Sequence, residues 1–220
     1  MSNPITILDE HSVAIARSLD IMILSTESLF EKFVREDPSL RGLKTFWSHA
    51  SEIRERSVEL VVSKMLTARN DLRASLSDSE RLHSETHDDT EMFIHSVREA
   101  FRAFMSQVQT IYAKRFRDIA AARVFGSDTY NPDPRIVTGS GRKWNFTDYA
   151  FLTARQMLVD WYNTSKLDYL TENGYTEFTL YTLNPELMNE VYKVEDYPSI
   201  AEKLFHPRTT KLIGGPNVST

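Results

Sequence analysis

Apolar positions repeat at helical spacing along most of this chain. The clearest example is residues 88–126, where the repeating side chains are Ile94, Val97, Phe101, Phe104, Val108, Ile111 and Ile119. Steps of three and four place them on one face of a helix. Asp88, Asp89 and Thr90 are suited to cap the first turn, and Gly126 is suited to end the last one. We therefore predict one long helix over this stretch.

Three further stretches carry the same pattern. We predict helices from residue 9 or 11 to 35, from 43 to 76, and from 147 or 148 to 173. Asp37-Pro38 ends the first, because the residue before a proline is pushed out of the helical region. The apolar steps approach about 3.5 residues in places, so a coiled coil shared with a neighbouring subunit is a variant of this architecture.

The C-terminal part of the chain has a weaker and more mixed pattern. Residues 175–183 alternate threonine with larger apolar side chains, which predicts a short strand. Residues 186–193 and 199–205 follow prolines and predict two short helices. Residues 1–8 and 206–220 show little periodicity and are interpreted as extended arms.

The predicted fold class is therefore mainly α. We expect an elongated bundle of four long helices over residues 1–174, which includes a long loop at 127–146. A small appendage and an extended tail follow over residues 175–220. Residues 77–91 break the apolar pattern, as a loop or as a helical extension beyond the core.

Charge is distributed unevenly over this predicted architecture. Residues 77–91 hold six acids and one base, whereas residues 92–126 hold six bases and two acids. An acidic connector thus adjoins a basic helix and loop, an asymmetry that bears on partners. The basic side chains are candidate contacts for an anion or a nucleic acid: Arg98, Arg102, Lys114, Arg117, Arg142 and Lys143.

Composition excludes several classes of chemistry. The chain has no cysteine, which excludes disulfides, thiolate metal sites and cysteine nucleophiles. No apolar run approaches the ~20 residues of a membrane span, and the start lacks the features of a signal peptide. We expect a cytoplasmic protein without membrane partners, or a virion component if the source is viral.

Four side chains that bind metals or titrate recur every fourth residue. His83, His87, Glu91 and His95 would lie in one row on a continuous helix, a spacing that can present two imidazoles to a metal. However, His95 lies off the apolar face, and the intervening SETHDD is better suited to ending and starting helices. A solvated acidic connector is the preferred interpretation, and no metal or cofactor is predicted.

A glycine-containing turn is the other candidate for ligand chemistry. TGSGRK at residues 138–143 has glycines and two cations, but its spacing is not that of a phosphate-binding loop. A turn before Trp144 is the preferred interpretation. The serines and histidines form no recognisable nucleophile motif, and adjacent carboxylates occur only at helix boundaries. We therefore expect no catalytic activity.

One arginine interrupts the apolar face of the helix at 88–126. Arg115 lies in line with Val108, Ile111 and Ile119, where it needs a carboxylate, a carbonyl or a subunit boundary. Aromatic and arginine side chains near the long loop are also typical of interfaces. The candidate interface residues are Arg115, Tyr130, Arg135, Trp144 and Phe146.

These features favour a non-catalytic structural or assembly subunit of a homo- or hetero-oligomer, for example in a virion or phage particle. One alternative is a helical nucleic-acid-binding protein that uses the basic surface of residues 92–143. A second alternative is an enzyme or ligand-binding domain with its site at loop 127–146.

Overall fold

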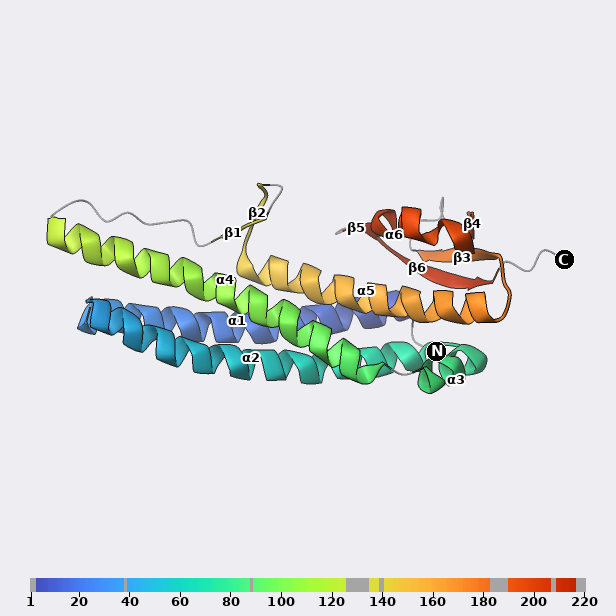
Figure 1. Ribbon diagram of the computed structural model, residues 1–220, viewed down its shortest axis with the longest axis horizontal. Helices are drawn as coiled ribbons and strands as arrows, with labels where there is room; N and C mark the ends of the chain where they lie inside the picture. The colour runs from blue at the N-terminus through green and yellow to red at the C-terminus, as the bar shows by residue number, and fades with distance from the viewer. Residues whose placement is uncertain are drawn as a thin grey trace. The chain divides into compact units, whose positions relative to one another are not determined.

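The four long helices are present in the structure. The computed structural model describes residues 3–37, 39–87, 89–125, 135–138, 141–182, 190–206 and 209–216. Its long helices are α1 (Pro4–Glu36), α2 (Leu40–Ala74), α4 (Thr90–Phe125) and α5 (Phe146–Glu172) (Figure 1). A mainly α fold is therefore confirmed. The predicted cap positions Asp88 and Gly126 lie outside the described residues.

The chain divides into two compact units that each combine distant stretches of sequence. Unit 1 comprises residues 1–12, 65–91 and 152–220, and unit 2 comprises residues 13–64 and 92–151. Long helices contribute residues to both units, so this division differs from the predicted boundary at residue 174.

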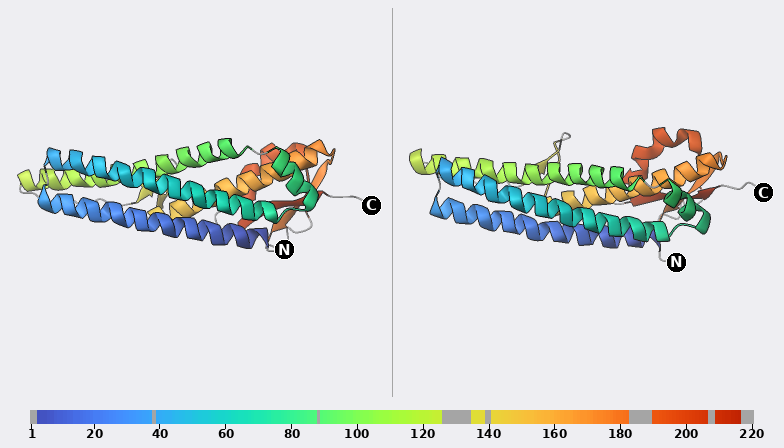
Figure 2. Two further views of the ribbon diagram at one scale, coloured as in Figure 1. Left: turned by 90° about the horizontal axis from the view of Figure 1, so that it is seen from below. Right: turned by 60° about the horizontal axis from the view of Figure 1, so that its bottom comes forward.

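Unit 2 is built from helices that lie alongside one another, with segments of α1, α2 and α4 (Figures 1 and 2). Aromatic rings join these three helices. The ring of Phe30 lies 6.3 Å from that of Phe46, 5.4 Å from that of Tyr112 and 6.3 Å from that of Phe116, measured between centroids. Gln109 is fully buried and donates a hydrogen bond to the carbonyl of Ala50. Burial of these large rings accounts for much of the stability of the unit.

A small hairpin lies in the stretch that the sequence predicts as a long loop. Strands β1 (Ile136–Val137) and β2 (Lys143–Trp144) pair antiparallel. Gly141 has a φ of 77° in the connecting turn, a left-handed conformation that favours glycine. Ile136 is buried, which explains why this side of the turn packs on the unit. The glycine-containing motif at 138–143 therefore includes a hairpin turn.

Unit 1 contains an antiparallel sheet that packs against the end of α5 (Figure 1). Its strand order is β4-β3-β6-β5, with β3 at Glu177–Thr182, β4 at Val191–Lys193, β5 at Phe205–His206 and β6 at Thr209–Pro216. A 3-10 helix η2 (Val194–Asp196) and helix α6 (Tyr197–Leu204) connect β4 to β5. The apolar cluster beneath the sheet joins α5 to two strands through Leu170, Phe178, Leu180 and Ile213.

The prediction of an extended N-terminal arm is wrong for residues 4–8. Helix α1 begins at Pro4, and the side chain of Asn3 accepts a hydrogen bond of 2.8 Å from the backbone N–H of Ile5. Asn3 thus caps the helix, with Pro4 in the first position, where a proline is tolerated. Ile5 and Leu8 are buried, which supplies the reason for the earlier start.

The prediction of an extended C-terminal tail is also wrong for residues 209–216. Strand β6 pairs with β3 and β5 and is a central strand of the sheet. The strand predicted at 175–183 is confirmed as β3. The helix predicted at 186–193 is wrong for residues 191–193, which form β4, and residues 183–189 lie outside the described part of the chain.

The acidic connector contains a short helix, α3 (Asp78–Thr86). Glu80 accepts hydrogen bonds from the backbone N–H of Ser77 at 3.0 Å and from its hydroxyl at 2.7 Å, so that the first turn is closed by its own sequence. The sequence left open whether this connector is a loop or a helical extension. Residues 78–86 of it are helical and belong to unit 1.

Candidate functional site

Arg115 lies in the apolar interior face of α4, as its position in the sequence indicates. It is half-buried, and its guanidinium carbon lies 5.1 Å from the centroid of the Phe30 ring. Its Nε is buried without a hydrogen-bond acceptor among the described residues. Arg115 is therefore held by its stem and by the face of an aromatic ring of the same unit.

The other predicted interface residues fall in different environments. Phe146 is buried against Tyr112 with ring centroids 6.2 Å apart, so it contributes to the core of unit 2. Trp144 is half-buried in β2, and Arg135 is exposed just before β1. Tyr130 lies outside the described residues. The structure thus does not gather these side chains into one surface among the residues that it describes.

Two of the predicted basic contacts are engaged by carboxylates of unit 2. Arg98 makes a two-point contact with Glu59 at 2.9 and 3.0 Å. Arg102 lies 3.3 Å from Glu55 and 2.9 Å from Glu99. The hydrogen bond from Arg98 lowers the pKa of Glu59. A nucleic acid would have to compete with these pairs. The remaining side chains of this set are exposed, namely Lys114, Arg117, Arg142 and Lys143.

The outer face of α1 in unit 2 carries large apolar side chains in solvent. Val13 is 37% exposed, Ile21 is 64% exposed and Leu24 is 52% exposed, whereas the opposite face of the helix packs into the unit. Arg17 is exposed between Val13 and Ile21, and Ser28 is exposed one turn beyond Leu24. We call the exposed positions 17, 21, 24, 28 and 31 the outer seam of α1. Their spacing of four, three, four and three is the heptad spacing of a coiled coil.

Charged groups lie towards the two ends of the outer seam. Arg17 is exposed on the N-terminal side, and Glu31 is exposed on the C-terminal side. Neither side chain forms an ion pair with another described residue. Ile21 and Leu24 lie between them. The seam is thus an apolar centre with a positive end and a negative end.

A second polar arrangement lies in unit 1 and begins with the anchoring of α3. Lys166 of α5 is buried and donates hydrogen bonds of 2.8 Å to Glu80 and 2.8 Å to the carbonyl of Gly214. Gly214 lies at the β-bulge where the register of β6 against β3 shifts. Burial alone would raise the pKa of Glu80, but hydrogen bonds from Lys166 and Ser77 outweigh it, so that the pKa is lowered. This network fixes α3 on α5.

Fixing α3 in this way brings two histidines to the end of α5. His83 Nε2 lies 2.9 Å from Glu172 Oε2, and His87 Nε2 lies 3.6 Å from Glu172 Oε1. The two imidazole rings are stacked, with centroids 4.4 Å apart and an interplanar angle of 27°. Among the described residues, these three side chains form a group whose ligand atoms all lie within 4.8 Å of one another. We call them the His83–His87–Glu172 cluster.

Further acidic side chains surround this cluster. Desolvation raises the pKa of Asp168, and the carboxylates of Glu172 and Asp89 add to the rise, while His83 opposes it. The cluster also lies at the C-terminal ends of α3 and α5, where helix dipoles contribute negative potential. The electrostatic environment therefore favours a cation.

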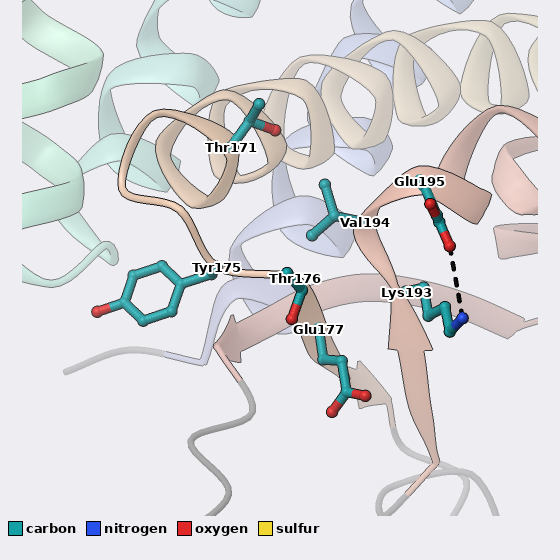
Figure 3. A pocket seen from close by; sticks show the side chains of 7 residues that line it. All are labelled: Thr171, Tyr175, Thr176, Glu177, Lys193, Val194 and Glu195. Atoms are coloured by element: carbon teal, nitrogen blue, oxygen red, sulfur yellow. Dashed lines mark hydrogen bonds and ion pairs between the residues drawn. The ribbon is translucent and has the colours of Figure 1, made fainter.

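A pocket of about 610 Å³ opens between the end of α5, β3, β4 and η2 (Figure 3). Thr171 and Thr176 contribute hydroxyl groups to its lining, and Tyr175 contributes a ring. Lys193 and Glu195 turn towards each other at its rim and form an ion pair of 3.4 Å. The lining residues do not include a nucleophile paired with a histidine, and we assign no reaction to this pocket.

The histidine spacing at residues 83–95 and the structure indicate different sets of metal ligands. His83 and His87 do converge, but their third member is Glu172 rather than Glu91 or His95. The sequence signal was the His-x-x-x-His spacing. The carboxylate could not be identified from the sequence, because only the packing of α3 on α5 brings Glu172 beside the histidines.

The outer seam of α1 was not identified from the sequence either. Apolar periodicity in a sequence indicates the buried face of a helix, and single exposed apolar residues carry little signal without knowledge of what covers them. None of the helices within the described residues has an apolar stretch that could span a membrane.

Comparison of the chain with known protein families, with curated proteins and with solved structures finds no match.

Proposed function

We propose that this chain is a non-catalytic assembly subunit that pairs with a second copy of itself through the outer seam of α1. The observation that carries the proposal is the exposure of Ile21 and Leu24 at heptad spacing. Large apolar side chains on one continuous helix face are typical of a surface that another protein covers.

The distribution of charge favours a second copy in antiparallel orientation. In an antiparallel pair centred between residues 21 and 24, Ile21 of each copy faces Leu24 of the other. Arg17 then faces Ser28 of the other copy, and Glu31 lies one helical turn, about 5 Å, further along. Each positive end of the seam therefore meets a negative end. A parallel pair would place Arg17 beside Arg17 and Glu31 beside Glu31, which is repulsive.

The size of the apolar centre sets the strength that we expect. Covering the exposed parts of four such side chains contributes about 1 to 1.5 kcal/mol each, or roughly 4 to 6 kcal/mol in total. The loss of translational and rotational freedom on association costs on the order of 4 kcal/mol or more. Flanking contacts of Val13 and the charged ends add to the gain. We therefore expect a weak dimer, with a Kd of about 1 mM or weaker.

Light scattering over a concentration series tests the proposal. The native chain should shift from monomer to dimer mass as its concentration passes through the Kd. The double variant Ile21→Ser, Leu24→Ser should remain monomeric at concentrations where the native chain is mostly dimeric. Both side chains are exposed, so the folded state should lose little stability, about 0.5 kcal/mol or less for each.

Met92→Ser is the matched control. Met92 is 64% exposed, as Ile21 is, but it belongs to α4. This variant should dimerise as the native chain does. The proposal fails if the native chain remains monomeric throughout, or if the α1 double variant and the Met92 variant dimerise equally well.

A further inference from the structure

The hydrogen-bond contacts of His87 Nδ1 are the starting point for a second site. Its Nδ1 lies 3.1 Å from the carbonyl oxygen of His83 and 3.1 Å from the hydroxyl of Thr86. The Thr86 hydroxyl is 2.8 Å from the same His83 carbonyl, to which it donates. Both neighbours of Nδ1 are therefore acceptors, and the proton of a neutral His87 lies on Nδ1.

This tautomer leaves the lone pair of His87 on Nε2. That atom faces the Glu172 carboxylate at 3.6 Å. A lone pair and a carboxylate oxygen repel each other at this distance, and either a proton on Nε2 or a metal ion between the two groups removes the repulsion. A backbone carbonyl that accepts from Nδ1 is also the arrangement that commonly orients histidine ligands of metals.

The distances from the two imidazoles to the Glu172 carboxylate fit one metal ion. With bonds of about 2.0 to 2.1 Å to zinc, two ligand atoms of a tetrahedral site lie roughly 3.3 Å apart. His83 Nε2 lies 2.9 Å from Glu172 Oε2 and His87 Nε2 lies 3.6 Å from Glu172 Oε1, on either side of that value, and one ligand atom of each residue lies within 4.8 Å of the other two. His83 and His87 are four residues apart at the end of α3, a spacing that presents both rings to one ion.

We propose that His83, His87 and Glu172 bind one divalent transition-metal ion, with Zn²⁺ the best match to two imidazole nitrogens and one carboxylate oxygen. Three protein ligands leave a fourth position for water or another donor. His87 and Glu172 have side chains 56% and 52% exposed, so that the ion has access from solvent. Bound there, the metal joins the C-terminal end of α3 to that of α5.

The ligand atoms of the proposed site also predict which metal ions should fail to bind. Imidazole nitrogen suits Zn²⁺, Co²⁺, Ni²⁺ and Cu²⁺, whereas Mg²⁺ and Ca²⁺ prefer sites made of oxygen ligands alone. The site should therefore discriminate against Mg²⁺ and Ca²⁺ even when these are in large excess.

Calorimetric titration of the full chain with Zn²⁺, in buffer free of chelators, tests the proposal. We expect one ion per chain, and we expect His87→Ala and Glu172→Gln to bind at least about 10-fold more weakly. His95→Ala is the matched control, because His95 is exposed on α4 and outside the cluster. Circular dichroism of each variant shows whether the fold is retained.

The absorption spectrum of the Co²⁺ complex gives a second readout that does not depend on stability. A four-coordinate Co²⁺ site has intense visible bands, which should be present in the native chain and in His95→Ala but lost in Glu172→Gln. The proposal is overturned if Zn²⁺ does not bind, if Mg²⁺ competes with it at similar concentration, or if His87→Ala and Glu172→Gln bind as His95→Ala does.

Discussion

Arg115 shows how a charged residue is accommodated in an apolar helix face. Its stem packs within unit 2 and its guanidinium lies over the Phe30 ring, while its Nε lacks an acceptor among the described residues. The interaction with the ring favours the charge by about 0.5 to 1 kcal/mol or more, but leaving a buried N–H without a partner costs on the order of 1 to 3 kcal/mol. The charge of Arg115 is thus not expected to contribute to stability.

Two substitutions of Arg115 separate its stem from its charge. Arg115→Met keeps the unbranched stem and removes the unpaired donor, and its free energy of unfolding should equal or exceed that of the native chain. Arg115→Ala removes the stem from Phe30 as well and should lower the free energy of unfolding by about 1 to 2 kcal/mol. Urea unfolding of both variants is the measurement. A loss of stability in Arg115→Met as large as that in Arg115→Ala would show that the charge is required.

Predictability from the sequence differs between residues for a physical reason. The position of Arg115 on the apolar face follows from helical periodicity alone, because it depends only on neighbours within the same helix. Asn3 and Pro4 form a helix start whose signal is also local, although the weak periodicity of residues 1–8 favours an extended arm. Glu172 joins His83 through packing of two helices far apart in the chain, and the sequence has no local pattern that reports such a contact.

At the scale of elements, periodic helices and the alternating strand β3 are predictable, whereas a strand without an alternating pattern is not. The long helices each repeat their apolar positions over many turns, so that an error of a few residues at the ends does not alter the assignment. Strand β6, by contrast, contains Gly214 and Gly215 and ends at Pro216, residues that weaken a strand signal. It exists because β3 supplies its hydrogen-bonding partner.

The anchoring of α3 is the element whose stability should depend most clearly on pH. Glu80 is buried and paired with Lys166, and its pKa is lowered from the ordinary value of 4.5. Because the folded pKa is below the unfolded pKa, the contribution of Glu80 is fully present above about pH 4.5. It is lost as the pH falls through the lower, folded value.

Two variants test this expectation in urea unfolding from pH 7 to pH 3. Lys166→Met leaves a buried carboxylate without its cation and should lower the free energy of unfolding at pH 7 by roughly 3 to 5 kcal/mol. Adding Glu80→Gln to it should recover much of that loss. The penalty of the single variant should also diminish in acid, where Glu80 becomes neutral. A penalty that is the same at pH 7 and pH 3 would contradict the assigned role of the pair.

At the scale of the whole molecule, the proposed assembly depends on how two copies meet. The outer seam of α1 is the same on each copy, and an antiparallel pair of identical helices has two-fold symmetry, which closes at a dimer. The metal site in unit 1 is independent of this contact, since its three ligands come from one chain. Loss of metal binding should therefore not change the pairing of α1.

Disulfide trapping measures the proposed contact most directly, because the native chain has no cysteine. The variants Ile21→Cys and Leu24→Cys, one carrying a mass tag, are mixed and oxidised, with Met92→Cys as the control for random collision. Antiparallel pairing centred between these residues predicts that the mixed disulfide, Cys at 21 to Cys at 24, forms faster than either disulfide between identical variants. Disulfides between identical variants in excess, or trapping no faster than that of Met92→Cys, would contradict the antiparallel pairing of α1.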